Sequence, residues 1–270
     1  MGLNFAGGGY AYTEADISDS PALRLEDVEM EKSSWVFKYI RTFELFEKSA
    51  RVDLTQGYEK GRWTGLLDGK PASTERAGWT DTIARFSVNL YGAPPLTGKD
   101  YTDYRAKTEV ETIVGAALAV HFPTGEYMSE RLINLGSNRY TIRPQFGVVH
   151  NRYNWTLEAG AAAWIYTDND DFFGGSRLEN APLYVFQSHA IYTWESGFWA
   201  SAAAGYAFGK RSTIDGVEKS DRKEIKAWSL GVGYPITRDW GVKIGYVGLR
   251  RLARNGFDSD SFVVAISHFW

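Results

Sequence analysis

The final nine residues of the chain constrain its fold more than any other stretch. Within residues 262–270, Phe262, Val264, Ile266 and Trp270 fall on one face at a period of two, and the sequence stops on an aromatic residue. The last strand of an outer-membrane β-barrel has these properties, because it faces lipid, places an aromatic at the membrane interface and pairs with the first strand. An edge strand of a soluble β-sandwich would give the same pattern. The rest of the chain has to separate these alternatives.

Composition restricts any membrane insertion to strands. The chain has 15% aromatic residues and 28 glycines, but no apolar run approaches the roughly 18 residues that a membrane helix needs. The formal charge of −3 and the pI near 5.9 give no basic field of the kind that binds phosphate backbones, so nucleic acid is not an expected partner. The absence of cysteine is compatible with export. The first ten residues resemble no signal peptide, which we therefore expect to be absent from this chain.

From about residue 33 onward, the sequence divides into segments of alternating polarity separated by turn-rich stretches. In the segment 82–90, for example, Phe86 and Val88 oppose Arg85 and Ser87. About twelve such segments give roughly twenty residues per strand and connection, more than soluble sandwiches use. They are centred on residues 35–45, 51–58, 63–67, 82–90, 110–122, 140–148, 153–165, 183–194, 198–208, 227–234, 240–246 and 262–270. We predict an all-β fold in which residues 33–270 form a closed antiparallel transmembrane β-barrel of about twelve strands.

Connection lengths and tryptophan positions favour the outer membrane over a soluble sandwich. Short connections at 150–154, 195–197 and 237–239 alternate with longer polar ones at 123–138, 168–181, 209–221 and 250–258, as expected for periplasmic turns and outer loops. The long segment 92–107 is an exception, because parity assigns it to the periplasmic side. Seven tryptophans lie near strand ends, where interfacial girdles would form: Trp63, Trp79, Trp155, Trp194, Trp228, Trp240 and Trp270. We therefore expect the apolar faces to point outward, toward the lipid and lipopolysaccharide of a bacterial outer membrane.

Residues 1–32 are interpreted as a separate periplasmic or lumenal segment. Gly7, Gly8 and Gly9 would let an extended chain turn at the periplasmic end of the barrel, and the charged stretch 22–32 would form a short helix in or under the lumen. The first hairpin is expected to turn at 46–49, with Thr42 opposite Asp53. Arg41 then falls on the apolar face, which requires either a β-bulge or a position near the membrane interface.

Five phrases in the sequence resemble an outer-membrane channel family named for a meta-pathway of phenol degradation. They occur in order over nearly the whole chain, at Asn89 to Pro94, Pro123 to Tyr127, Asn134 to Arg139, Thr167 to Phe172, and Gln187 to His189 with Tyr192. The resemblance implies a monomeric channel of about twelve strands from a Gram-negative bacterium, of a kind often linked to uptake of hydrophobic or aromatic compounds. One departure is Gly209-Lys210-Arg211, where the family pattern has a glycine pair.

Catalytic and metal-binding patterns are weak in this sequence. None of the four histidines, His121, His150, His189 and His268, has a serine placed to hydrogen-bond with it, so we expect neither an enzyme nor a cofactor. The acidic stretch at Asp168, Asp170 and Asp171 lacks the glycine and bidentate glutamate of a calcium loop. A solvated outer loop that bridges lipopolysaccharide through divalent ions is the favoured interpretation, and a Ca²⁺ site is the alternative.

The polar faces of the strands are the candidate functional surface. A twelve-stranded barrel is wider than the eight strands that side chains can fill, but narrower than the sixteen or more strands of an open porin, so a narrow channel is expected. Eleven residues are predicted to line it: Glu44, Arg51, Asp53, Arg85, Glu109, Glu111, Arg139, Arg143, Glu158, His189 and Lys243. In one hypothesis Arg85 and Arg143 face Glu109, Glu111 and Glu158 at a constriction. In the other, opposite charges pair across strands and fill the lumen.

The sequence thus favours a passive outer-membrane channel for small, hydrophobic or aromatic molecules, without covalent chemistry. The alternative is a structural or adhesive outer-membrane barrel with a blocked lumen. A soluble β-protein is the third possibility, and it would purify without detergent. Periodicity does not identify the permeant, because selectivity depends on the width of the lumen.

Overall fold

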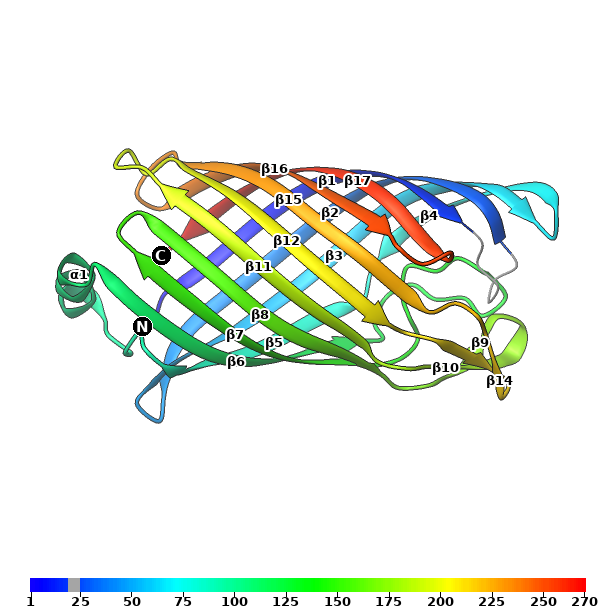
Figure 1. Cartoon of the computed structure of the whole chain (residues 1–270), viewed down its shortest axis with the longest axis horizontal. Helices are drawn as coiled ribbons and strands as arrows, with labels where there is room; N and C mark the ends of the chain where they lie inside the picture. Colours follow the sequence, from blue (N-terminus) through cyan, green and yellow to red (C-terminus); the bar gives the residue numbers. More distant parts are fainter. Residues whose placement is uncertain (19–24) are drawn as a thin grey trace.

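Twelve antiparallel strands close into a barrel in the computed structural model, which describes residues 1–18 and 25–270 (Figure 1). This confirms the fold class predicted from the sequence. The barrel strands are β1 (Asn4–Ser18), β2 (Leu25–Leu45), β3 (Lys48–Leu67), β4 (Lys70–Trp79), β5 (Thr82–Tyr91), β6 (Val110–Phe122), β7 (Thr141–Arg152), β8 (Trp155–Tyr166), β11 (Leu183–Thr193), β12 (Trp199–Gly209), β15 (Lys223–Pro235), β16 (Trp240–Arg251) and β17 (Gly256–Phe269). Strands β4 and β5 both pair with β3 and act as two halves of one barrel strand.

The barrel closes between its first and last strands. Strand β1 lies between β17 and β2, with Gly8 opposite Ile266 on one side and Phe37 on the other. At the end of the seam, Asn4 and Trp270 exchange two backbone hydrogen bonds of 2.9 and 3.1 Å. Both termini therefore lie at the same end of the barrel (Figure 1). Closure of this kind leaves no unpaired edge facing lipid.

The prediction of a separate lumenal segment at residues 1–32 is wrong. Residues 4–18 form a wall strand, residues 25–32 begin β2, and residues 22–24 lie outside the described part of the chain. Gly7, Gly8 and Gly9 are paired strand residues without the positive φ of a turn. Because glycines carry no side chains, their alternation between faces cannot be detected by periodicity. The predicted count of twelve strands nevertheless holds. Strand β1 adds one strand to the prediction, and the predicted segments 51–58 and 63–67 merge into the single strand β3.

The hairpin between β2 and β3, which was the first hairpin predicted from the sequence, is two residues tighter than expected. A two-residue turn at Phe46 and Glu47, both with positive φ, joins β2 to β3 and places Thr42 opposite Arg51 instead of Asp53. The shift is an even number of residues, so every side chain keeps its predicted face. Arg41 lies opposite Asn4, the first residue of β1, so it is near the end of the barrel, and no bulge interrupts the ladder at this position.

The apolar rows point away from the barrel axis. Phe262 is 64% exposed, Ile266 46% and Phe86 37% on the outer surface, whereas the inward-facing Asp53 of β3 is only 2% exposed. Such a continuous apolar surface is unfavourable in water, but it is well solvated by the acyl chains of a lipid bilayer. The fold is that of an outer-membrane barrel, and it agrees with the predicted location in the bacterial outer membrane.

Two groups of aromatic side chains mark the membrane interfaces. On the outer side, Tyr10, Trp35, Tyr58 and Trp79 follow one another across β1, β2, β3 and β4, with ring centroids 5.5, 6.0 and 5.3 Å apart. At the opposite end, Tyr192 packs against Trp155 and Trp194, and His268 stacks between Trp240 and Trp270. Trp63 belongs to neither group, because it is buried and faces the inside of β3.

The two ends of the barrel differ. At the outer end, β9 (Asn169–Phe172), β10 (Ser176–Asn180), β13 (Ser212–Ile214) and β14 (Val217–Glu218) form a small separate sheet (Figure 1). At the end that holds the termini, α1 (Gly98–Lys107) projects from the connection between β5 and β6, as expected for segment 92–107. The connection predicted at 250–258 is shorter than expected, because β16 continues to Arg251 and β17 starts at Gly256.

Candidate functional site in the barrel lumen

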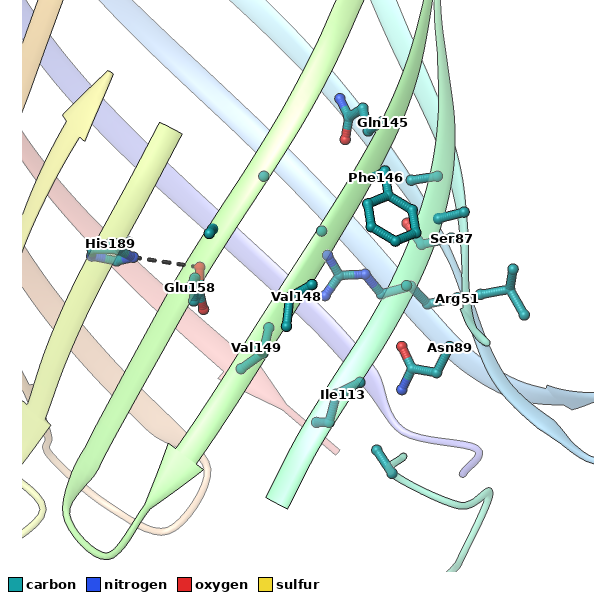
Figure 2. A pocket seen from close by; sticks show the side chains of 18 of the residues that line it. Arg51, Ser87, Asn89, Ile113, Gln145, Phe146, Val148, Val149, Glu158 and His189 are labelled. Carbon is teal, nitrogen blue, oxygen red and sulfur yellow. Dashed lines mark ion pairs between the residues drawn. The ribbon is translucent and has the colours of Figure 1, made fainter. Parts of the chain in front are cut away.

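A cavity of about 1060 Å³ occupies the lumen next to the periplasmic end (Figure 2). Small inward-facing residues of adjacent strands leave this space open, among them Gly115 of β6, Gly147 of β7 and Gly160 of β8. Six of the eleven predicted residues line it: Arg51, Arg85, Glu111, Arg143, Glu158 and His189. The cavity is thus bounded by charged side chains over a floor of glycine and alanine.

Asp53 binds two of the lumenal arginines. It lies directly opposite Arg85 in the β3–β5 ladder, and Arg85 Nε donates a 2.5 Å hydrogen bond to Asp53 Oδ2. On the same strand, Arg51 Nε lies 3.4 Å from Asp53 Oδ1. Since one carboxylate serves two guanidinium groups, this cluster keeps a positive charge.

Glu158 and His189 form a second contact across the wall. They are opposite each other in β8 and β11, and 3.6 Å separates Glu158 Oε2 from His189 Nδ1. Figure 2 shows the two side chains directed toward each other. The hypothesis that charges pair across strands therefore describes this pair and the Asp53 cluster. It does not describe Arg143.

Arg143 has an aromatic partner. Its guanidinium carbon lies 4.8 Å from the centroid of Trp164, which faces inward from the neighbouring strand β8. Ala119 of β6 stands between Arg143 and Arg85 in the ladder. Because the side chain of Ala119 is only a methyl group, it does not block the guanidinium groups of Arg85 and Arg143 from the lumen. Among the described residues, no carboxylate forms an ion pair with Arg143.

Lys38 and Lys243 extend the cationic surface to the closing seam. Lys38 of β2 lies opposite Gly7, and Lys243 of β16 lies opposite Ala265. Lys243 was predicted from the sequence, whereas Lys38 was missed. Its alternation with the outward-facing Phe37 and Tyr39 was the available signal.

The helix α1 closes part of the periplasmic end. Tyr101, Tyr104 and Arg105 of this helix line the cavity. Buried Glu111 holds the helix: its carboxylate accepts hydrogen bonds from the Tyr104 hydroxyl, from Ala93 N at 2.8 Å and from Arg105 Nη1 at 3.2 Å. The closing element therefore comes mainly from the β5–β6 connection, and Met1, whose amino group donates to Leu96 O, lines the cavity beside it.

A further pair of cations lies at the outer mouth. Arg139 is 8% exposed, donates from Nη2 to Asn180 Oδ1 at 2.5 Å and lies 4.7 Å from the centroid of Tyr166. Lys210 Nζ is 5.1 Å from the same ring. Burial and the neighbouring Arg139 lower the pKa of Lys210 to about 8. Arg139 is thus at the outer end, as its position before β7 predicted, and does not line the cavity.

Glu44 and Glu109 also lie away from the cavity. Glu44 is exposed opposite Ser49, next to the β2–β3 turn. Glu109 is exposed in the short connection between α1 and β6, where its carbonyl accepts a hydrogen bond from Tyr153 N. The hypothetical pairing of Arg85 and Arg143 with Glu109 is absent, because Arg85 contacts Asp53 instead.

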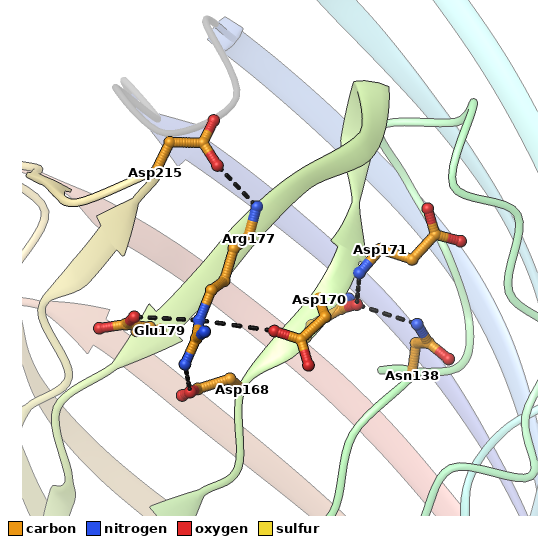
Figure 3. Close-up of polar contacts among 8 residues, drawn as sticks. Asn138, Asp168, Asp170, Asp171, Arg177, Glu179 and Asp215 are labelled. Atoms are coloured by element: carbon orange, nitrogen blue, oxygen red, sulfur yellow. Dashed lines mark hydrogen bonds and ion pairs between the residues drawn. The ribbon is translucent and has the colours of Figure 1, made fainter.

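The acidic stretch near residue 170 surrounds an arginine. Arg177 of β10 contacts Asp168, Asp170 at 3.4 Å and Glu179 at 3.1 Å (Figure 3). Its guanidinium occupies the position that a cation would take among these carboxylates. Over residues 1–18 and 25–270, no group of three metal-ligating side chains is arranged to hold an ion. The favoured interpretation of a solvated outer loop fits this arrangement better than a Ca²⁺ site.

The family model described as "Putative MetA-pathway of phenol degradation" matches residues 18–266. The chain belongs to this family. The match covers the barrel from the end of β1 to within β17, and agrees with the resemblance identified from the sequence phrases. No curated protein sequence matches the chain.

Solved structures with the same fold support the architecture of this family member. The COG4313 outer membrane channel from Pseudomonas putida F1 superposes with a TM-score of 0.82 at 18% identity, over 100% of this chain and 96% of that one. The transport unit of the autotransporter AIDA-I from Escherichia coli gives 0.51 at 12% identity, over 99% of this chain and 90% of that one. The β domain of the Bordetella autotransporter BrkA gives 0.51 at 9% identity, with full coverage of both chains. At these identities the likeness concerns the fold.

Proposed function

We propose that this protein is a monomeric, non-catalytic channel for passive uptake of small, hydrophobic or aromatic molecules across the outer membrane. The observation that carries the proposal is the cavity of about 1060 Å³ inside a closed barrel whose outer surface is apolar. Barrels that only anchor or adhere need no such space, and eight strands suffice to fill a lumen with side chains. The channel structure among the solved relatives is consistent with this role.

The chemistry of the cavity wall supports an apolar or aromatic permeant. Trp164 of β8, Val149 of β7 and Val185 of β11 face the cavity, together with the small residues between them. An aromatic solute could contact these side chains at several positions in place of water. Because it would bind only weakly at each position, it could also move on, and passage through a channel requires this.

A matched pair of variants tests this function. Gly147 faces the lumen, and a Cβ at this position would meet only Ala159 O, at 3.6 Å. Gly147→Phe should therefore fold and fill the cavity. The control Ile142→Phe places the same ring on the lipid face of the same strand, since Ile142 is 37% exposed and does not line the cavity. We expect single-channel conductance in planar bilayers to fall in Gly147→Phe and to remain at the wild-type level in the control.

Liposome swelling with a panel of phenols, alkanes and sugars would define the permeants. The proposal expects faster swelling with phenols than with sugars of similar size, and loss of this rate in Gly147→Phe. Equal rates for all solutes would contradict the preference for hydrophobic and aromatic molecules.

The rival function is a structural or adhesive barrel with a blocked lumen. It is favoured by the covers at the two ends, namely α1 and the sheet β9–β10–β13–β14. A bilayer that stays silent with correctly folded protein would support this rival and contradict the channel.

A further inference from the structure

We infer that the lumen selects negatively charged solutes and that its permeants are small carboxylates with an apolar or aromatic body. This inference rests on the proposed channel function and adds the charge of the permeant. It comes from the placement of basic side chains around the barrel, which brings together residues more than 200 positions apart in the sequence.

Five inward-facing cations follow one another along eight of the twelve barrel strands, from β16 across the closing seam to β7. Lys243 is on β16, Lys38 on β2, Arg51 on β3, Arg85 on β5 and Arg143 on β7. The positions between them on β17, β1 and β6 are small: Ala265, Gly9 and Ala119. Since neighbouring strands are about 4.8 Å apart, Arg85 and Arg143, two strands apart, are separated by about 10 Å along the wall. The long basic side chains therefore reach the lumen without steric competition.

Carboxylates do not balance the charge on these strands. Asp53 is shared by Arg51 and Arg85, and Glu158 contacts His189 on the opposite wall. Among the described residues, Lys38, Lys243 and Arg143 form no ion pair. Two other inward acids of the strands are engaged elsewhere, since Glu111 holds α1 and Glu59 binds Lys32 at 2.9 Å. Glu44 lies beside the β2–β3 turn, away from these cations. The five cations on these strands thus face only two carboxylates, those of Asp53 and Glu158.

The outer mouth holds two further cations. Arg139 and Lys210 lie on one tyrosine ring, and buried Arg139 Nη1 has no hydrogen-bond partner within the described residues. Carboxylates lie near both cations, Asp168 near Arg139 and Asp221 near Lys210. The anion preference therefore rests on the cations of the lumen, and the mouth adds to it only the charge that these carboxylates leave unbalanced.

A lumen surrounded by lipid focuses the field of these charges, which raises the local concentration of anions. The adjoining strands β8 and β11 supply the apolar surface of Trp164, Val185 and Leu183. The cationic strands are suited to a carboxylate, and β8 and β11 to a hydrocarbon or aromatic body. Benzoate has both features, while benzyl alcohol has a similar size without the charge.

Reversal potentials across a KCl gradient test the inference on the full-length protein in planar bilayers. We expect chloride to be more permeant than potassium, and the permeability ratio to fall several-fold in the double variant Lys38→Met and Lys243→Met. Lys70→Met is the control and should retain the wild-type ratio, since Lys70 is exposed at the start of β4, directly after the β3–β4 turn. In proteoliposomes, benzoate should enter faster than benzyl alcohol through the wild-type protein, after subtraction of leakage through protein-free vesicles.

Failure of this inference and failure of the channel function give different results. A conducting wild-type protein that is non-selective or prefers potassium would overturn the anion selectivity and leave the channel intact. A silent bilayer would overturn both. Because the wild-type measurement decides the sign of selectivity, the conclusion does not depend on whether the double variant folds.

Discussion

Arg85 Nε and Asp53 Oδ2 are 2.5 Å apart, across the ladder that joins β5 to β3. The sequence separates these residues by 32 positions, and the barrel makes them cross-strand neighbours. Asp53 is almost fully buried beneath the two arginines that it binds. This contact fixes the centre of the cationic wall.

Replacing Asp53 with asparagine should destabilise the barrel and increase its anion selectivity. Arg51 and Arg85 would lose their shared counter-charge, and removing one member of a buried ion pair costs about 3 kcal/mol. Urea unfolding in lipid vesicles measures the loss of stability, and reversal potentials measure selectivity. Unchanged values of both would show that this contact contributes nothing to the wall.

Replacing Glu111 with glutamine should loosen α1 at the periplasmic end. The variant keeps an acceptor for the Tyr104 hydroxyl but loses the charge that binds Arg105. We expect higher conductance and faster tryptic cleavage within Gly98–Lys107. Glu109→Gln is the matched control, since Glu109 is exposed and two residues away. If both variants behave alike, Glu111 does not hold the helix.

Selectivity should depend on pH through Lys210, which lies outside the strands at the outer mouth. Burial, and then Arg139, lower its pKa to about 8 in the folded protein. The unfolded state therefore binds its proton more tightly, so the contribution of Lys210 to stability rises as pH increases from about 8 toward its ordinary value. In the folded protein the mouth loses this positive charge as the pH passes through about 8. We expect the chloride-to-potassium ratio to fall between pH 7 and 9 in the wild type, and to change less in Lys210→Met.

Charge placed on the outer wall should be more damaging than charge placed on the inner wall. Phe86 points to lipid and Ser87 to the lumen on the same strand. Phe86→Arg should cost about 2–4 kcal/mol near the membrane midplane, whereas Ser87→Arg should cost much less because water and the lumen accommodate the guanidinium. Unfolding measurements in vesicles compare them, and equal losses would contradict the assigned faces.

The alternation of polar and apolar residues was sufficient to predict most strands of the barrel wall. Alternation at Phe86 and Arg85, and again at Phe262 to Ile266, predicted strands and the polarity of their faces, because side chains of a strand point to opposite sides at a period of two. It failed where side chains are missing, at Gly7 to Gly9 in β1. It also divided β3 in two, since Gly57 and Gly61 interrupt its pattern in the same way.

The sequence by itself determined that this protein is a barrel of long strands with apolar exterior faces, because alternation and aromatic position are local properties. Only the tertiary structure decided which charges meet. Asp53 binds Arg85, Arg143 lies over Trp164, and Lys38 shares a wall with Lys243. These partners are set by the register of each strand pair, including the pair at the closing seam, because the register fixes how far along the barrel each side chain lies. A shift of two residues, as in the first hairpin, preserves each face but changes every partner, and periodicity cannot detect such a shift.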